Sequence, residues 1–327
     1  MRTRHAVAVA ASLAAAVVLA GCNSSSPAPA GGGGASSGGS NAKTMVNVGV
    51  GSGTFAAVLS TEFFAASGLD LVQKQVNSGA AAVPLLLNGQ LQFTAADSVG
   101  ALTAISKNVP LVIVAMATSS GSSAESDETA VLVKTDSPVR SARDLEGKKV
   151  AVNGIGNTAQ LGTQAAIDKL GGDSTKVQFV ETPPPTMNAF VTNGTVDAAV
   201  VNEPRLSQGK ATGLRALFSP MAETLPSVPL FVYVTSQSYV AQHRDVVEKF
   251  ARDMVAANTF AAQHPEFVRN FAVLNQKLTP EQAAILTLPL FDPPTVGKPA
   301  MQQVMDLMLK YKTITASVDL NKAIVTP

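Results

Sequence analysis

Cysteine, histidine and clustered charge are scarce in this chain of 327 residues. Cys22 is its only cysteine, so no internal disulfide can form. Beyond the first residues the histidines are His243 and His264, and neither has a second histidine or a cysteine at ligand spacing, which argues against a zinc site. The formal net charge is +1 and no basic block occurs, so the chain lacks the concentrated positive footprint of nucleic-acid-binding proteins. We therefore expect no metal site and no nucleic-acid partner.

Long apolar runs are also few, and the longest stands at the start of the chain. It is Ala6–Ala20, preceded by the basic Met1–His5. A bilayer span needs about 20 apolar residues, whereas this length and basic flank are typical of a secretory signal. The run ends in Leu-Ala-Gly-Cys22, which resembles the bacterial lipobox, in which the cysteine is acylated. We predict a signal peptide over residues 1–21 and a lipid on Cys22; the alternative is a buried thiol.

Residues 22–42 contain no charge and no large apolar side chain; they are mostly Ser, Gly, Ala and Pro. Such a composition cannot bury a core, so it predicts a disordered tether. The folded part then begins near Lys43 and is long enough for one large domain or two modest ones. No later apolar stretch reaches membrane-spanning length, so the lipid is the only membrane link that we expect.

Strands alternate with helices after Lys43. β-Branched runs such as Met45–Val50, Val150–Val152 and Val196–Val201 are separated by helical segments and by turns that carry Gly or Asn. This alternation is typical of βαβ units on a parallel sheet. In such a sheet, ligands bind where the carboxyl ends of strands meet the amino ends of helices. The pattern predicts the α/β class and a ligand-binding edge.

This pattern occurs twice along the chain. Gly51–Thr54 follows one strand and Gly154–Thr158 follows another; likewise, Asn88-Gly89 and Asn193-Gly194 each precede a strand. Two similar βαβ lobes with opposed polar edges would explain the likeness. The alternative is that any two α/β units resemble each other to this degree.

The C-terminal third has apolar residues at helical spacing. Val246, Val247, Phe250, Met254 and Val255 form one such stripe, and Met301, Val304, Met305 and Met308 form a second. The spacing predicts amphipathic helices, with the methionines in the core and not at a metal site. Thr279 before Pro280 predicts a helix start with a capping hydroxyl.

Motifs for enzyme chemistry are weak. Gly154–Ala159 fits the loose dinucleotide pattern after a strand, with Glu181 near the end of the next strand. Gly51–Thr54 lacks the lysine of a P-loop, and no Gly-x-Ser-x-Gly precedes either histidine. By contrast, free N–H groups at helix starts can bind an anion without any base or nucleophile. The residues therefore favour binding over catalysis, and they predict no cofactor.

Several phrases of the chain together resemble one protein family. They are Leu145–Val152 (Leu-Glu-Gly-Lys-Lys-Val-Ala-Val), Asn193–Ala198 (Asn-Gly-Thr-Val-Asp-Ala) and Glu203-Pro204. This combination resembles the solute-binding proteins of nitrate/sulfonate/taurine-type ABC importers, a group that includes relatives binding thiamine-precursor pyrimidines. Leu86–Phe93 also matches a family phrase, although Gln92 stands where aspartate is usual. The resemblance covers roughly Met45 to the C-terminus.

The resemblance implies an α/β, two-lobed periplasmic-binding-protein fold of the type with two crossing strands and a cleft between the lobes. Glu128–Lys134 and Pro229–Val234 are the expected crossing strands. Lobe one would take residues 43–124 and 227–327, and lobe two residues 125–226. Closure of the lobes on a ligand would be the signal that the membrane permease reads.

The resemblance also implies partners and a location. We expect a small-molecule solute, an ABC permease and its ATPase as partners, and a monomeric binding protein without enzyme activity. It would be exported and held by its lipid on the outer face of the cell membrane, or on the periplasmic face of an envelope membrane. The alternatives are a sensory or adaptor lipoprotein without transport, and an exported enzyme on the same fold.

Carried over position by position, the expected ligand contacts lie at strand ends in both lobes. They are Ser52, Gly53, Thr54, Phe55, Ser78, Gly79, Asp97, Ser98 and Thr118 in lobe one, and Asn153, Asn157, Thr158, Asn202 and Glu203 in lobe two. Each type of residue also has a simpler role. Asp97, Ser98 and Thr158 are possible helix caps, Gly53 is a possible backbone requirement, Phe55 a possible core residue, and Glu203-Pro204 a possible structural turn.

The charges of these loops suggest a ligand class. None of them contains Arg or Lys, while Asp97 and Glu203 are acidic. An acid near the ligand would favour a solute that carries an amine or a ring N–H. We therefore expect a small zwitterion or a nitrogen heterocycle in preference to bare nitrate.

Overall fold

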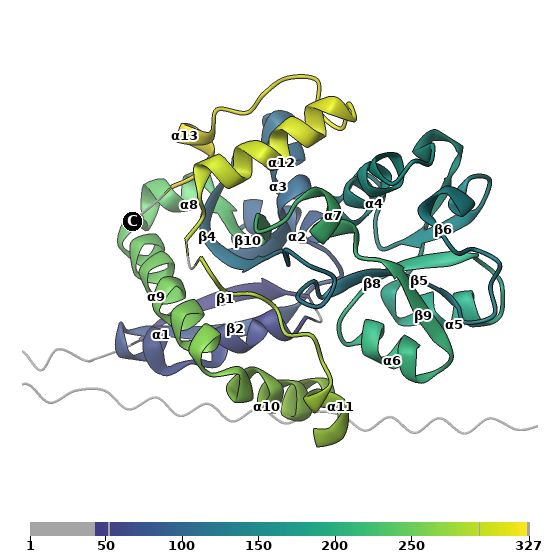
Figure 1. The fold of residues 1–327 in the computed structure, drawn as a ribbon. Helices are drawn as coiled ribbons and strands as arrows, with labels where there is room; N and C mark the ends of the chain where they lie inside the picture. The colour runs from purple at the N-terminus through teal and green to yellow at the C-terminus, as the bar shows by residue number, and fades with distance from the viewer. Residues whose placement is uncertain (1–42, 52, 294, 326–327) are drawn as a thin grey trace, which may run out of the picture. The chain divides into compact units, whose positions relative to one another are not determined.

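Alternating apolar residues build two five-stranded sheets in the computed structural model, which describes residues 43–51, 53–293 and 295–325 (Figure 1). The first sheet has the spatial order β2 (Leu69–Gln75), β1 (Thr44–Val50), β3 (Phe93–Asp97), β10 (Pro229–Ser236) and β4 (Leu111–Ser119). The second has the order β7 (Gln178–Glu181), β6 (Lys149–Val152), β8 (Ala198–Asn202), β5 (Thr129–Lys134) and β9 (Leu214–Phe218). The predicted βαβ alternation is confirmed.

Each sheet contains one antiparallel strand, and both occupy the same place in the strand order. In the first sheet β1 is parallel to β2 and β3, while β10 is antiparallel to β3 and β4. In the second, β6 is parallel to β7 and β8, while β5 is antiparallel to β8 and β9. β5 follows β4 of the other sheet and β10 follows β9, so these strands are the two crossings that the sequence predicts.

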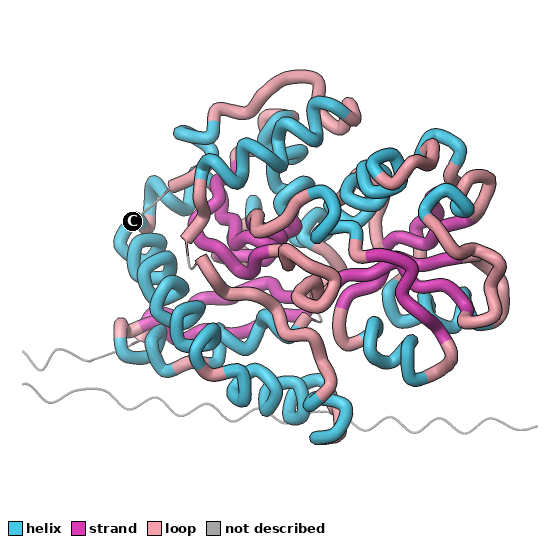
Figure 2. The backbone as a smooth tube through the Cα atoms, in the orientation of Figure 1, coloured by secondary structure: helices cyan, strands magenta, loops and turns pink. Residues whose placement is uncertain are grey.

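Helices cover both faces of the sheets (Figure 2). Those of the first sheet include α2 (Gly79–Leu87), α3 (Ser98–Ser106), α9 (Arg244–Gln263) and α12 (Lys298–Lys310). The second sheet carries α4 (Thr158–Lys169), α5 (Met187–Thr192), α6 (Arg205–Ala211) and α7 (Pro220–Thr224). The remaining helices used below are α8 (Gln237–Gln242), α10 (Pro265–Gln276), α11 (Pro280–Ala284) and α13 (Leu320–Ala323). We call each sheet with its helices a lobe.

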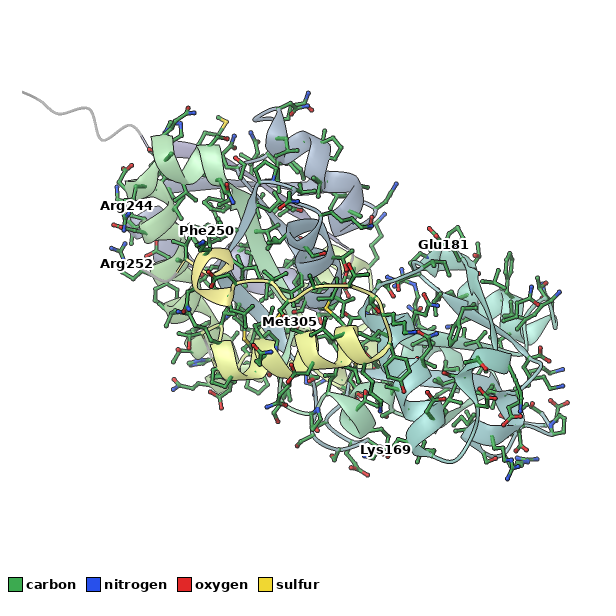
Figure 3. The ribbon with its side chains drawn as sticks, turned by 90° about the horizontal axis from the view of Figure 1, so that it is seen from above. Lys169, Glu181, Arg244, Phe250, Arg252 and Met305 are labelled. Carbon is green, nitrogen blue, oxygen red and sulfur yellow. The ribbon has the colours of Figure 1, made fainter. Side chains whose placement is uncertain are left out.

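The period of two along β10 shows why the first sheet is covered on both sides. Val232 and Val234 belong to one apolar cluster, and Tyr233 between them belongs to another on the opposite face. α12 contributes Met305 to the first cluster and α9 contributes Phe250 to the second; both side chains are labelled in Figure 3. Both predicted amphipathic stripes are therefore core, and the methionines of α12 are buried as expected.

The segment after β1 differs from expectation. Gly68, a typical residue after a helix end, predicts one helix over Phe55–Ser67. The chain instead forms a 3₁₀ helix, η1 (Thr54–Ser60), and then a short helix, α1 (Glu62–Ala66). The break is at Thr61, which is extended and whose hydroxyl donates to the Val58 carbonyl at 2.8 Å. A side-chain hydroxyl that bonds a nearby carbonyl competes with the helix ladder, so the helix ends there.

Two further features of the fold bear on the predictions. Thr279 caps α11, with Pro280 at its first position, as expected. Within the described part of the chain, no helix is both long and apolar enough to cross a membrane. The predicted signal peptide, tether and Cys22 lie outside the described residues.

We expect Phe250→Ala to lower the free energy of unfolding by about 3–5 kcal/mol, the usual cost of removing a buried Phe side chain. Phe250 is fully buried, and its ring stacks on Phe93 with centroids 3.9 Å apart. The measurement is urea unfolding followed by circular dichroism. The matched control is Leu274→Ala on α10, which removes a side chain that is 79% exposed and should change stability by less than about 0.5 kcal/mol. Equal costs for the two variants would contradict the assigned core.

Candidate functional site

The carboxyl ends of strands in the two sheets meet at Asp97, the last residue of β3. Its Oδ1 accepts a hydrogen bond from the Gly100 amide at 2.9 Å and so caps α3 of its own lobe. The same oxygen accepts from the Thr158 amide at 3.1 Å and from the Thr158 hydroxyl at 2.8 Å, at the start of α4 in the other lobe. One carboxylate therefore serves the amino ends of two helices.

Thr158 makes the contact reciprocal. Its hydroxyl oxygen accepts from the Val99 amide of α3 at 3.3 Å, and its side chain is buried. We call the set Asp97, Val99 and Thr158 the α3–α4 contact. The cap of α4 itself is Asn157, whose side chain accepts from the Gln160 amide. Capping was one alternative for Asp97, Ser98 and Thr158; it is correct for Asp97 and wrong for the other two.

α4 is tied to the first lobe at its other end as well. Tyr311, which follows α12, donates its hydroxyl to Asp168 Oδ2 at 2.7 Å. Between the two ends, Leu161 belongs to the same buried cluster as Met301 of α12 and Val228 before β10. The two lobes are therefore packed together along this helix.

Glu203 makes a second connection, on the α6 side. Its Oε2 accepts from the Ser207 amide at 3.0 Å, and its Oε1 accepts from the Ser207 hydroxyl at 2.7 Å. Oε1 also accepts from the Thr287 amide at 3.1 Å, in the segment that leads from α11 to α12. The side chain is buried. This carboxylate holds the first turn of α6 and the segment that crosses beside it.

Two more buried acids precede β5. Asp127 accepts from the Thr129 amide at 3.0 Å and the Ala222 amide at 2.9 Å; burial nevertheless raises its pKa to about 6. Glu128 is buried, and its Oε1 has no hydrogen-bond partner among the described residues. Burial, reinforced by the charges of Asp127 and Glu203, raises the pKa of Glu128 to about 8. At neutral pH the Glu128 carboxyl is therefore held mainly in its neutral form.

The start of η1 and the end of β4 present buried hydroxyls beside an aromatic pair. Phe55 stacks on Phe231, with ring centroids 5.2 Å apart and planes 16° apart. Phe231 pairs with Thr118 in the β10–β4 ladder. The hydroxyl oxygens of Thr54 and Thr118 are buried and find no partner within the described part of the chain. Unpaired buried hydroxyls are costly unless something else binds them.

Four of the other expected contacts bond or pack within their own lobe. Ser78 caps α2 by accepting from the Ala81 amide at 3.1 Å, and Ser98 donates to the Pro229 carbonyl at 2.5 Å. Gly79 lies so close to Ala96 that a side chain would collide with it. Asn153 accepts from Asn157 Nδ2 at 2.9 Å in the exposed loop after β6.

Asn202 and Ser52 are the remaining two expected contacts. Asn202 is half-buried at the end of β8, and Ser52 lies outside the described residues.

A cavity of about 470 Å³ lies where η1, α6 and α10 approach one another. Its lining comes from both lobes: Val50, Gly51, Gly53, Ala56, Gln73 and Gln75, then Pro204, Arg205 and Gln208, and then Phe271, Asn275 and Gln276. Among the described residues, Gly53 is the one expected contact that lines it, and its missing side chain leaves room for the Phe55 ring. The volume is in the range of small-molecule sites.

Arg205 is the residue that the sequence analysis missed. It is the first residue of α6 and is half-buried, and burial lowers the pKa of its guanidinium. Among the described residues that line the cavity it is the only charged side chain. The signal was present, because Arg205 follows directly after Glu203-Pro204 at the carboxyl end of β8. This cavity therefore contains a guanidinium, whereas the loops expected to bind the ligand contain no Arg or Lys.

The described residues include no group of three or more His, Cys, Asp or Glu side chains placed to hold a metal ion. His264 stacks on Phe260, and His243 lies against the Tyr239 ring. Both histidines therefore make ring contacts on helices of the first lobe.

Comparison with known proteins finds a family match over most of the chain and a related protein of known name. Residues 53–267 match the family model described as NMT1/THI5 like. The taurine-binding periplasmic protein of Escherichia coli (strain K12) is 27% identical over 226 residues, which are 68% of this chain and 68% of that protein.

Solved structures share the fold. The alkanesulfonate-binding protein SsuA from Xanthomonas axonopodis pv. citri, bound to MOPS, superposes with a TM-score of 0.72 at 17% identity, over 87% of this chain and 99% of that one. The periplasmic nitrate-binding protein NrtA from Synechocystis PCC 6803 gives 0.72 at 15% identity, over 86% of each chain. The expected periplasmic-binding-protein fold is confirmed.

We expect the side chains of Asp97 and Thr158 to be coupled across the lobes. Asp97→Ala should lower the free energy of unfolding by about 1–3 kcal/mol, because it leaves buried amides of two helices without an acceptor. In a double-mutant cycle with Thr158→Val, the double variant should lose about 0.5–3 kcal/mol less stability than the sum of the losses of the two single variants. The measurement is urea unfolding of the four proteins.

Ser78→Ala is the matched control for this cycle, because Ser78 caps a helix within one lobe only. Its cost of about 1 kcal/mol should add to that of Thr158→Val. Strict additivity for Asp97 and Thr158 would show that the α3–α4 contact contributes no stability.

Burial of the Glu128 carboxyl should make the stability of the fold depend on pH. The pKa of Glu128 rises from an ordinary 4.5 to about 8 on folding, so between these values the folded chain binds more protons than the unfolded one. The contribution of this group to the free energy of unfolding is fully present below about pH 4.5, and it is lost as the pH rises to about 8. Glu128→Gln does not titrate. Its free energy of unfolding relative to wild type should therefore rise between pH 5 and pH 9, by an amount on the order of a few kcal/mol.

Urea unfolding at pH 5, 7 and 9 measures this difference. Glu266→Gln, which removes an exposed carboxylate, is the control and should leave the pH profile unchanged. Parallel profiles for Glu128→Gln and wild type would show that Glu128 titrates normally.

Proposed function

Since this chain belongs to the NMT1/THI5-like family, we propose that it is the extracytoplasmic solute-binding component of an ABC importer. The proposal is supported by its likeness to a taurine-binding periplasmic protein and by a fold shared with alkanesulfonate- and nitrate-binding proteins. It captures a small organic solute, sulfonate- or taurine-like or pyrimidine-like, and delivers it to the permease. Neither this role nor the site described above requires enzyme chemistry.

The observation that carries the proposal is the cavity lined from both lobes. Gly53 and Gln75 line it from the first lobe, and Arg205 and Gln208 from the second. A ligand shifts a conformational equilibrium only by its difference in affinity for the two states. A solute held by residues of both lobes favours the arrangement in which the lobes approach, and that arrangement is what a permease and its ATPase would read.

The finer assignments belong to the same proposal. Lobe one comprises residues 43–124 and 227–327, and lobe two residues 125–226. The chain works as a monomer, exported and anchored through a lipid on Cys22. The hydroxyls of Thr54 and Thr118 are buried and have no partner among the described residues, which supports a role for the η1 and β4 ends in ligand binding. Asp97, Glu203 and Thr158 act mainly by joining the lobes, since their polar atoms already bond across them.

A thermal-shift and calorimetry screen of the full chain tests the function. The panel is taurine, alkanesulfonates, nitrate and aminopyrimidines. A ligand that binds only the folded chain raises its apparent stability by mass action, by about 2.7 kcal/mol at a hundred times its dissociation constant. We expect a clear shift with one class of compound and no chemical change in the recovered ligand.

Each other outcome has a definite meaning. Turnover of the ligand would favour the exported enzyme. Binding without any dependence of cellular uptake on the protein would favour the sensory or adaptor lipoprotein. If the folded chain binds no compound of the panel, the proposed solute classes are wrong.

A further inference from the structure

The cavity beside α6 combines one guanidinium with several carboxamides. Besides Arg205, its polar side chains are Gln73, Gln75, Gln208, Asn275 and Gln276. They come from β2 and α10 of the first lobe and from α6 of the second. The described residues that line the cavity include no carboxylate. Glu203, the acid nearest to Arg205 in sequence, already accepts hydrogen bonds from backbone amides.

This arrangement differs in chemistry from the site that the loop sequences suggest. A planar guanidinium presents a fork of donors that matches the oxygens of a carboxylate or sulfonate. A carboxamide offers two donors and an acceptor with two lone pairs but no charge. Gln73 and Asn275 each use one donor in bonds to Ser60 and Phe271. Such a lining suits uncharged polar groups and has no partner for an ammonium.

The size of the cavity adds a second restriction. At about 470 Å³ it lies within the range of sites that enclose drug-sized molecules. A short aminosulfonate such as taurine would reach the guanidinium but is too short to contact the carboxamides of both lobes at the same time. Polar groups that lose water on closure without gaining a partner reduce affinity.

We propose that this cavity selects monoanionic organic solutes larger than taurine, with the anionic group on Arg205 and an uncharged, hydrogen-bonding body against the carboxamides. The inference rests on the proposed function and narrows its ligand class. It makes Arg205 the specificity-determining residue. It also replaces the zwitterion that the acidic loops suggest by a solute whose nitrogen is acylated or otherwise uncharged.

Isothermal titration calorimetry of the full chain tests the inference with four probes. N-acetyltaurine has the sulfonate and a polar, uncharged body; taurine has an ammonium instead; octanesulfonate has an apolar body; N-acetylethanolamine lacks the anion. We expect wild type to bind N-acetyltaurine at least about tenfold more tightly than each of the others, since each lacks charge-assisted or neutral hydrogen bonds.

Variants on α6 and α10 separate the two parts of the site. Arg205→Gln should weaken binding of N-acetyltaurine about tenfold to a hundredfold, and Arg205→Lys should weaken it less. Lys210→Gln is the matched control, because it removes a positive charge from an exposed position of the same helix; affinity should stay within about twofold. Asn275→Leu should reduce the ratio of the affinity for N-acetyltaurine to the affinity for octanesulfonate. Thermal unfolding of each variant confirms that it is folded.

The results distinguish a failure of the cavity assignment from a failure of the proposed function. Tight taurine binding that Arg205→Gln leaves unchanged overturns the assignment of this cavity, while the proposed function stands. Equal binding of N-acetyltaurine and octanesulfonate by wild type overturns the role of the carboxamides. If the folded wild-type chain binds no sulfonate at all, the inference and the sulfonate form of the proposed function both fail.

Discussion

The Asp97 carboxylate accepts hydrogen bonds from two helix starts that belong to different lobes, and the packing of α4 against the first lobe depends on this contact. Buried amides at a helix start must find an acceptor. Here a single oxygen serves Gly100 in one lobe and Thr158 in the other. Together with the Tyr311–Asp168 bond and the apolar packing of Leu161, it holds α4 against the first lobe. The cavity beside α6 lies where different elements, η1 and α10, meet the second lobe.

The acids of this region bond to the protein itself, while the one cation lines the cavity within the described residues. Asp97 and Glu203 accept from backbone amides of the opposite lobe, whereas Asp127 accepts from amides of its own lobe. Glu128 is different: it lies buried beside two other acids, and its raised pKa follows from that burial. Arg205 lines the cavity as its only charged side chain within the described residues. The anionic ligand that we propose rests on this single charge.

Most of the fold could be predicted because its signals are local. Alternation along β10 and the helical spacing of Phe250, Met254 and Met305 each depend on residues within a few positions of one another. The exception, the break at Thr61, arises because one hydroxyl bonds the chain behind it. The site was harder. Strand ends identify a polar edge, but Asp97 and Thr158 could be recognised as partners only once the two edges were placed against each other.

The sequence by itself determined the α/β class, the crossing strands and the family resemblance, since periodicity, turn residues and short phrases are properties of neighbouring residues. Tertiary structure decided which polar groups meet. It satisfied Glu203 with donors from α6 and from Thr287, and it brought Arg205 beside carboxamides of β2 and α10. Such contacts join residues far apart in the chain and depend on how two sheets face each other. No local pattern contains that information, and for this reason the charge of the cavity could be assigned only from the folded chain.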